Sequence, residues 1–114
     1  MIIDADVHIS PYPDEGGIGV EELLRRMDRA GVDKALTWLQ PPYRRELDES
    51  NEYVYQAVKR HPDRILGFGW ADPNLGLGKA KDTVKRCIDE YGFYGVKMNG
   101  AQNSFYWVEW PMLT

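Results

Sequence analysis

Apolar and polar residues alternate along the chain in two recurring patterns, one typical of strands and the other of helices. The period-two pattern and short apolar runs predict strands at four places, residues 2–9, 34–39, 64–70 and 95–99. Between them, apolar residues spaced by three and four predict helices at three places, near residues 20–30, 48–60 and 78–91. Gly31, Pro62 and Gly92 follow these helices, where each residue favours the end of a helix. The predicted order is therefore three strand–helix units, a fourth strand and an aromatic tail at 100–114.

Strands that alternate with helices through short connections predict a parallel sheet covered by helices. Such a sheet is either open and doubly wound or part of an eight-stranded barrel. The first strand decides between them, because one of its faces is apolar, with Ile3, Ala5, Val7 and Ile9, and the other is polar, with Asp4, Asp6 and His8 after Ile2. An open parallel sheet needs apolar residues on both faces. The sequence thus favours an α/β fold of parallel (β/α) units that form about half of a TIM (β/α)8 barrel, as one partial domain over 1–114.

Composition narrows the class of protein. The net charge of −4 gives no basic patch of the kind that binds nucleic acid. No apolar run approaches the ~20 residues that cross a bilayer, so no membrane association is expected. Cys87 is the only cysteine, which excludes an intramolecular disulfide and predicts a cytoplasmic protein. Buried packing is expected for Cys87 in preference to a reactive thiol.

Polar side chains follow the strands at the edge where parallel α/β enzymes keep their active sites. Asp6 and His8 stand two residues apart at the end of the first strand, so their side chains are expected on one face. Imidazole nitrogen and carboxylate oxygen are ligands of divalent metals such as zinc. Asp6 and His8 are therefore candidate metal ligands. The alternative is that Asp6 only holds His8 in one tautomer through a hydrogen bond.

Other polar residues offer further roles at the same edge. Lys97 is a candidate catalytic residue that would stabilise an anionic substrate or intermediate, or else would form a salt bridge to Asp4 or Asp6. Asn99 is a candidate substrate-binding residue, whereas Asp72 before a proline is expected to form a turn. The other histidine, His61, follows a helix and precedes a strand, which places it at the opposite end of the sheet. A third histidine ligand is therefore not expected within this chain.

Several short segments, in order, resemble the N-terminal half of the amidohydrolase-related proteins. They are residues 1–8, 27–34, 61–64, 66–68, 72–73 and 94–97. The resemblance implies a metal-dependent (β/α)8 barrel of a family that includes hydrolases and non-oxidative decarboxylases. In that family the first strand usually ends in His-x-His and both histidines bind the metal. Here Asp6 takes the first position, which is similar to a variant in decarboxylase-like branches.

The resemblance implies a metal-dependent hydrolase of small molecules in which a metal-activated water attacks a carbonyl, with zinc as the expected ion. A non-oxidative decarboxylase of a small carboxylic acid is the alternative. The family's remaining metal-binding histidines and its catalytic aspartate lie on later strands. This chain is therefore expected to be truncated before most of the site, so that by itself it holds the metal incompletely or not at all. A third hypothesis is a non-catalytic half-barrel that forms homo-oligomers through its exposed sheet edges.

Overall fold

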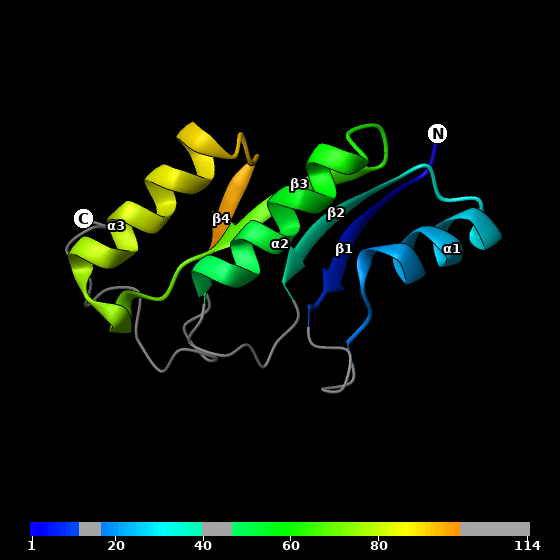
Figure 1. Cartoon of the computed structure of the whole chain (residues 1–114). Coiled ribbons are helices and arrows are strands. Elements are labelled where there is room, and N and C mark those ends of the chain that lie inside the picture. Colours follow the sequence, from blue (N-terminus) through cyan, green and yellow to red (C-terminus); the bar gives the residue numbers. More distant parts are fainter. Residues whose placement is uncertain (12–16, 40–46, 99–114) are drawn as a thin grey trace.

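Four parallel strands form one sheet in the order in which they occur in the chain (Figure 1). The computed structural model describes residues 1–11, 17–39 and 47–98. The strands are β1 (Ile3–Ile9), β2 (Lys34–Leu39), β3 (Ile65–Trp70) and β4 (Gly95–Lys97). The main helices are α1 (Val20–Ala30), α2 (Leu47–Arg60) and α3 (Leu77–Lys85). The predicted order of elements is therefore confirmed over the described residues.

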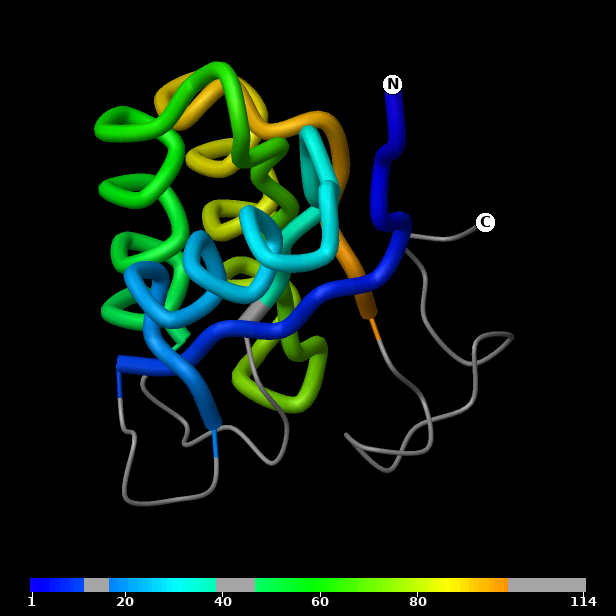
Figure 2. The backbone as a smooth tube through the Cα atoms, turned by 90° about the vertical axis from the view of Figure 1, so that its right-hand side faces the viewer, coloured from blue at the N-terminus to red at the C-terminus, as the bar shows by residue number. Residues whose placement is uncertain are grey.

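The three helices α1, α2 and α3 cover the same face of the sheet. Figure 2, seen from the β1 edge, shows them to one side of the strands. A doubly wound sheet carries helices on both faces and reverses its strand order, whereas sequential order with helices on one face is the arrangement of a barrel wall. The open doubly wound alternative is therefore excluded for the described part of the chain.

The hydrophobic core lies between the helices and the sheet. Ile9, Ala35 and Ile65 face it from the strands, and they meet Val54 and Ala57 of α2. The amphipathic pattern of α1 places its apolar side, Val20, Leu23 and Met27, in the same core. Gly31 ends α1 with a φ of 72°, the left-handed conformation that glycine adopts without strain.

Close packing against the helical turn η3 (Arg86–Glu90) explains one glycine of β3. A Cβ atom on Gly69 would lie 2.4 Å from Sγ of Cys87. Cys87 is 1 % exposed, as the sequence predicted, and burial raises the pKa of its thiol to about 12. Cys87 is thus a packing residue that approaches the sheet where no side chain intervenes.

The helix predicted over 78–91 is not uniform. It continues from α3 into a five-residue π-helical turn, η3 (Arg86–Glu90), before Gly92 reverses the chain at a φ of 65°. The fourth strand is shorter than predicted and ends at Lys97. Asn99 and the aromatic tail lie outside the described residues. None of the described helices combines the length and the apolar character needed to cross a bilayer.

The alternation expected along the first strand is interrupted. Asp4 pairs with Ala35 and Val7 pairs with Thr37, so three steps along β1 match two along β2. This is a β-bulge, and an extra residue reverses the faces on which the following side chains lie. Asp4 pairs with a residue of the helix-facing core, whereas His8 pairs with Trp38. The prediction that Asp4 shares a face with His8 is therefore wrong.

Candidate active site at the strand ends

His8 lies near the carboxyl end of β1 and faces away from the helices. Its neighbours Val7 and Ile9 pack with the core that the helices cover. Because successive side chains of a strand point to opposite faces, the His8 imidazole lies on the face that forms the inner wall of a barrel. The bulge before Val7 sets this orientation.

Asp6 lies close to this imidazole. Nε2 of His8 is 3.6 Å from Oδ1 of Asp6, which is too long for a hydrogen bond. Nε2 is buried and has no hydrogen-bond partner within the described residues. The Asp6 side chain is 68 % exposed, so one of the two groups remains open to solvent. The hydrogen bond that would fix the tautomer of His8 is therefore absent from this geometry.

The spacing of the two groups fits a shared divalent metal. Metal–nitrogen and metal–oxygen bonds of about 2.0–2.2 Å place neighbouring ligand atoms roughly 3–3.6 Å apart. The buried, unpaired Nε2 of His8 and the carboxylate of Asp6 meet this condition. Among the residues that the structure describes, no group of three His, Cys, Asp or Glu side chains could hold a metal. The described residues thus offer two candidate ligands and not a complete set.

The electrostatics of His8 favour the form that binds metals. Burial lowers the pKa of His8 below its usual value, the Asp6 carboxylate raises it, and the Lys97 ammonium lowers it. The net effect lowers the pKa of His8, so its imidazole stays neutral down to a lower pH than the imidazole of a free histidine. A metal ligand must be neutral imidazole, and this environment maintains it.

Lys97 ends β4 and lies on the same inner face as His8. One strand, β3, separates it from β2. It pairs with Trp70 in the register of β3 and β4. Its Nζ lies 5.2 Å from the ring centre of Trp38 and 5.3 Å from that of Trp70, within the range of a cation–π interaction. The alternative salt bridge from Lys97 to Asp4 or Asp6 is not formed in the described part of the chain. The ammonium is therefore held by aromatic rings, with no carboxylate to neutralise it there.

Asn51, which the sequence analysis did not single out, fixes the end of β3. Its side-chain amide accepts a hydrogen bond from the backbone N–H of Trp70 at 3.0 Å and donates one to the Trp70 carbonyl at 2.9 Å. The next residue, Ala71, donates its N–H to the carbonyl of Lys97. Asn51 thus ties α2 to the strand end that carries Trp70 and, through it, to β4.

Two other sequence candidates take the structural roles that were expected. Asp72 accepts a hydrogen bond from the backbone N–H of Asn74 at 2.9 Å and begins the 3₁₀ turn η2 (Pro73–Leu75). His61 follows α2 directly and bonds to the start of β3, the end of the sheet opposite His8. Its Nε2 lies 3.9 Å from Glu21 of α1. Neither residue meets Asp6 or His8.

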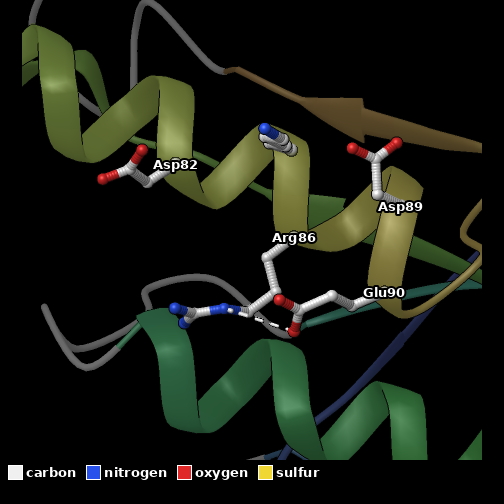
Figure 3. Close-up of a pocket in the computed structure, with 5 residues that line it drawn as sticks. Asp82, Arg86, Asp89 and Glu90 are labelled. Carbon is white, nitrogen blue, oxygen red and sulfur yellow. Dashed lines mark ion pairs between the residues drawn. The ribbon is translucent and has the colours of Figure 1, made fainter.

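A hollow in the helix layer does not coincide with this site. Its volume is about 230 Å³, and it is lined by Asp82, Lys85, Arg86, Asp89 and Glu90 of α3 and η3 (Figure 3). Arg86 and Glu90 lie 3.8 Å apart and form an ion pair, and Arg86 also lies 3.6 Å from Asp48. The acidic and basic side chains of the hollow lie on a helix surface, where Arg86 is paired with carboxylates. The strand ends remain the better candidate for chemistry.

The curated relatives of this chain include two gamma-resorcylate decarboxylases. No family model matches the chain. It is 28% identical over 90 residues to a gamma-resorcylate decarboxylase of Polaromonas sp. strain JS666, covering 68% of this chain and 26% of that protein. It is 26% identical over 91 residues to a gamma-resorcylate decarboxylase of Rhodococcus jostii strain RHA1, covering 71% of this chain and 27% of that protein. The chain thus spans about a quarter of the length of these curated relatives.

Solved structures share the fold. A 5-carboxyvanillate decarboxylase from Sphingomonas paucimobilis superposes with a TM-score of 0.80 at 18% identity, over 98% of this chain and 46% of that one. A 2,6-dihydroxybenzoate decarboxylase from Rhizobium gives 0.74 at 20%, over 98% and 44%. A dihydroxybenzoic acid decarboxylase from Polaromonas sp. JS666, solved with bound manganese and 2-nitroresorcinol, gives 0.72 at 20%, over 87% and 38%.

These comparisons confirm two of the sequence predictions. The parallel (β/α) units form about half of a TIM barrel, since each match covers less than half of the other chain. The resemblance to amidohydrolase-related proteins is confirmed as well, and decarboxylases are prominent among the matches. In sequence and in fold, the chain resembles part of these decarboxylases.

Proposed function

We propose that this chain is the N-terminal part of a metal-dependent, non-oxidative decarboxylase of an aromatic carboxylic acid. In this reaction the bond between the ring and the carboxylate breaks, carbon dioxide leaves, and a proton replaces it on the ring carbon. The relatives are decarboxylases, which supports this chemistry over the hydrolysis that the resemblance alone suggested. Residues 1–114 would form a single partial domain of the barrel.

One observation carries the proposal. His8 presents a buried Nε2 without a partner in the described residues, 3.6 Å from the Asp6 carboxylate, at the carboxyl end of a parallel strand. Burying a polar atom without a hydrogen bond is unfavourable. A bound cation between the two groups removes this cost, and the carboxyl ends of barrel strands are where catalytic groups gather.

Each candidate residue of this chain would have its own role in the reaction. Asp6 and His8 would hold a divalent metal, which supplies positive charge for a carboxylate and a neighbouring oxygen of the substrate. Lys97, whose ammonium has no carboxylate partner in the described part of the chain, would balance the negative charge of the bound acid. Asn99 stays a predicted substrate contact. The relative from Polaromonas binds manganese, so manganese joins zinc as an ion to be tested.

Metal binding tests the placement of the site. Titration of the chain with Mn²⁺ by calorimetry should give weak, saturable binding that His8→Ala reduces about tenfold or more, since one of two protein ligands is lost. His61→Ala is the matched control, because it removes the other imidazole at the far end of the sheet. Equal losses in both variants would show that the site is misplaced.

The two chemistries are separated by their products. The chain with Mn²⁺ is incubated with carboxyl-labelled 2,6-dihydroxybenzoate, and labelled carbon dioxide is measured alongside hydrolysis of an aryl ester. Turnover is expected to be slow, because the described residues lack a third metal ligand. Any metal-dependent product should be carbon dioxide. Metal-dependent ester hydrolysis without carbon dioxide would favour the hydrolase instead.

A self-associating half-barrel is the second candidate, and the β1 edge favours it. The start of β1 exposes apolar side chains, with Met1 88 %, Ile2 57 % and Ile3 47 % exposed. Exposed edge strands favour pairing with another chain. Light scattering of the metal-free chain measures this directly. A stable monomer near 13.2 kDa would remove the self-associating candidate.

A further inference from the structure

A second buried polar atom lies beside His8. Within the described residues, the buried side-chain nitrogens without a hydrogen-bond partner are Nε2 of His8 and Nε1 of Trp38. His8 and Trp38 are register partners on the adjacent strands β1 and β2. Paired positions of a parallel sheet lie on the same face, so both nitrogens belong to the inner face. The metal proposed above accounts for His8 and leaves the indole N–H unexplained.

An indole nitrogen is only a hydrogen-bond donor. A cation therefore cannot satisfy it, and the missing partner must be an acceptor. Buried donors in native structures are nearly always paired, and tryptophan is ordinarily buried where its N–H reaches a partner. The orphaned Nε1 of Trp38 thus indicates an acceptor atom brought by a ligand, next to the position that Asp6 and His8 reserve for a metal.

The surroundings of Trp38 fit a flat, anionic ligand. Its ring lies 4.4 Å from the ring of Phe68 at an interplanar angle of 37°. The Lys97 ammonium stands 5.2 Å from the same indole. Phe68 and Trp38 supply an aromatic wall, and Lys97 supplies positive charge. An aromatic ring with a carboxylate substituent matches both, since the ring packs on the wall and the carboxylate oxygens accept from charged and neutral donors.

We propose that Trp38 is a specificity-determining residue whose indole N–H donates a hydrogen bond to a carboxylate oxygen of the aromatic acid, beside the metal held by Asp6 and His8. This inference rests on the proposed function and adds a recognition element to it. A carboxylate oxygen is a stronger acceptor than an amide or a phenol. Trp38 therefore selects the acid over its uncharged analogues.

The test uses 2-hydroxybenzoate as the probe and Zn²⁺ as a diamagnetic metal. The ¹⁵N-labelled chain is titrated with the probe while the indole N–H signals are followed by NMR, and the signal of Trp38 is identified by its absence in Trp38→Phe. This signal should move downfield and saturate. Trp38→Phe should bind the probe about tenfold more weakly, as expected for loss of a hydrogen bond to a charged acceptor, with unchanged Zn²⁺ affinity. The wild type should prefer 2-hydroxybenzoate over 2-hydroxybenzamide, and this preference should be weaker in the variant, whereas the part that comes from the metal and Lys97 remains.

Tyr94→Phe is the matched control. Tyr94 directly precedes β4, is 72 % exposed, and has its ring centre 6.3 Å from that of Phe68. Loss of its hydroxyl should leave the affinity for the probe unchanged. The shift of the Trp38 signal is measured in the unsubstituted chain, and Trp38→Tyr gives the same assignment if Trp38→Phe does not fold.

The outcomes separate the two proposals. If the probe binds and its binding requires His8, but the Trp38 signal stays in place and Trp38→Phe binds equally well, the role of Trp38 is wrong while the metal site stands. If neither Zn²⁺ nor the probe binds to the wild type, the proposed function and this inference both fail.

Discussion

The Asn51 side chain offers a sharp test of how the strand ends are held. Replacing it by leucine keeps a side chain of similar volume in the same place, since Asn51 is 2 % exposed and lies within α2. The substitution removes both hydrogen bonds to Trp70, the 3.0 Å bond from its N–H and the 2.9 Å bond to its carbonyl. Trp70 is fully buried, so water cannot easily replace these partners.

The expected cost follows from the two backbone groups that lose their partner. Each buried, unsatisfied group costs about 1–3 kcal/mol. The added apolar surface of leucine offsets about 1–2 kcal/mol of this. The free energy of unfolding should therefore fall by about 1–4 kcal/mol, a large fraction of the stability of a domain of this size.

Urea denaturation followed by tryptophan fluorescence measures the change. With a slope of about 2 kcal/mol per molar urea, typical of a small protein, the midpoint should fall by roughly 0.5–2 M. Gln56→Leu is the control on the same helix, because among the described residues its amide donates to the side chain of Glu52 at 2.8 Å and holds no backbone group. A loss below about 1 kcal/mol for Asn51→Leu, or an equal loss for Gln56→Leu, would refute the bridging role of Asn51.

Three further predictions follow from the packing and charge of the described residues. Gly69→Ala should lower the free energy of unfolding by about 1–3 kcal/mol, because its Cβ would lie 2.4 Å from Sγ of Cys87, and Cys87→Ala in the same chain should restore part of the loss in urea melts. Native Cys87 should react with iodoacetamide at pH 8 far more slowly than the urea-unfolded chain, since burial raises the pKa of its thiol to about 12; equal rates by mass spectrometry would contradict its burial. Burial lowers the pKa of His8 below 6.5, so the unfolded state binds more protons as the pH falls through that value. The stabilising contribution of neutral His8 is thus complete above pH 6.5 and is lost below it, and urea midpoints of His8→Gln should depend less on pH than those of the wild type.

The order and layers of the fold were predictable because strands and helices impose different periods on apolar residues. The stripe of Val20, Leu23 and Met27 led directly to the buried face of α1. The bulge in β1 was not predictable in this way. A strict period of two assigns Asp4 and His8 to one face, and only pairing with the neighbouring strand shows the extra residue between Asp4 and Val7.

The site could be predicted in part. The rule that catalytic groups gather at the carboxyl ends of parallel strands gave His8 and Lys97 as candidates, and the structure brings both to one face. Asn51 was missed, although a signal existed: it lies in the apolar stripe of α2, between Leu47 and Val54, where a polar side chain needs a buried partner. Trp38 was missed because an unpaired N–H is a property of the assembled surroundings and leaves no mark in the sequence.

The inner face changes in character along the strands, and this change argues for a site at one end. Near the middle of the sheet, Leu36 pairs with Leu66, the kind of aliphatic residue that fills the interior of a barrel. Two residues further along these strands, Trp38 and Phe68 pack together, His8 lies beside Trp38 in the register, and the ammonium of Lys97 stands near the Trp38 ring. A barrel core built only for stability would continue with branched aliphatic residues, because unpaired polar groups reduce stability. The carboxyl ends of the strands carry instead the unpaired imidazole and indole nitrogens and the ammonium. Their cost in stability is best explained by a bound metal and an anionic aromatic ligand that together satisfy all three groups.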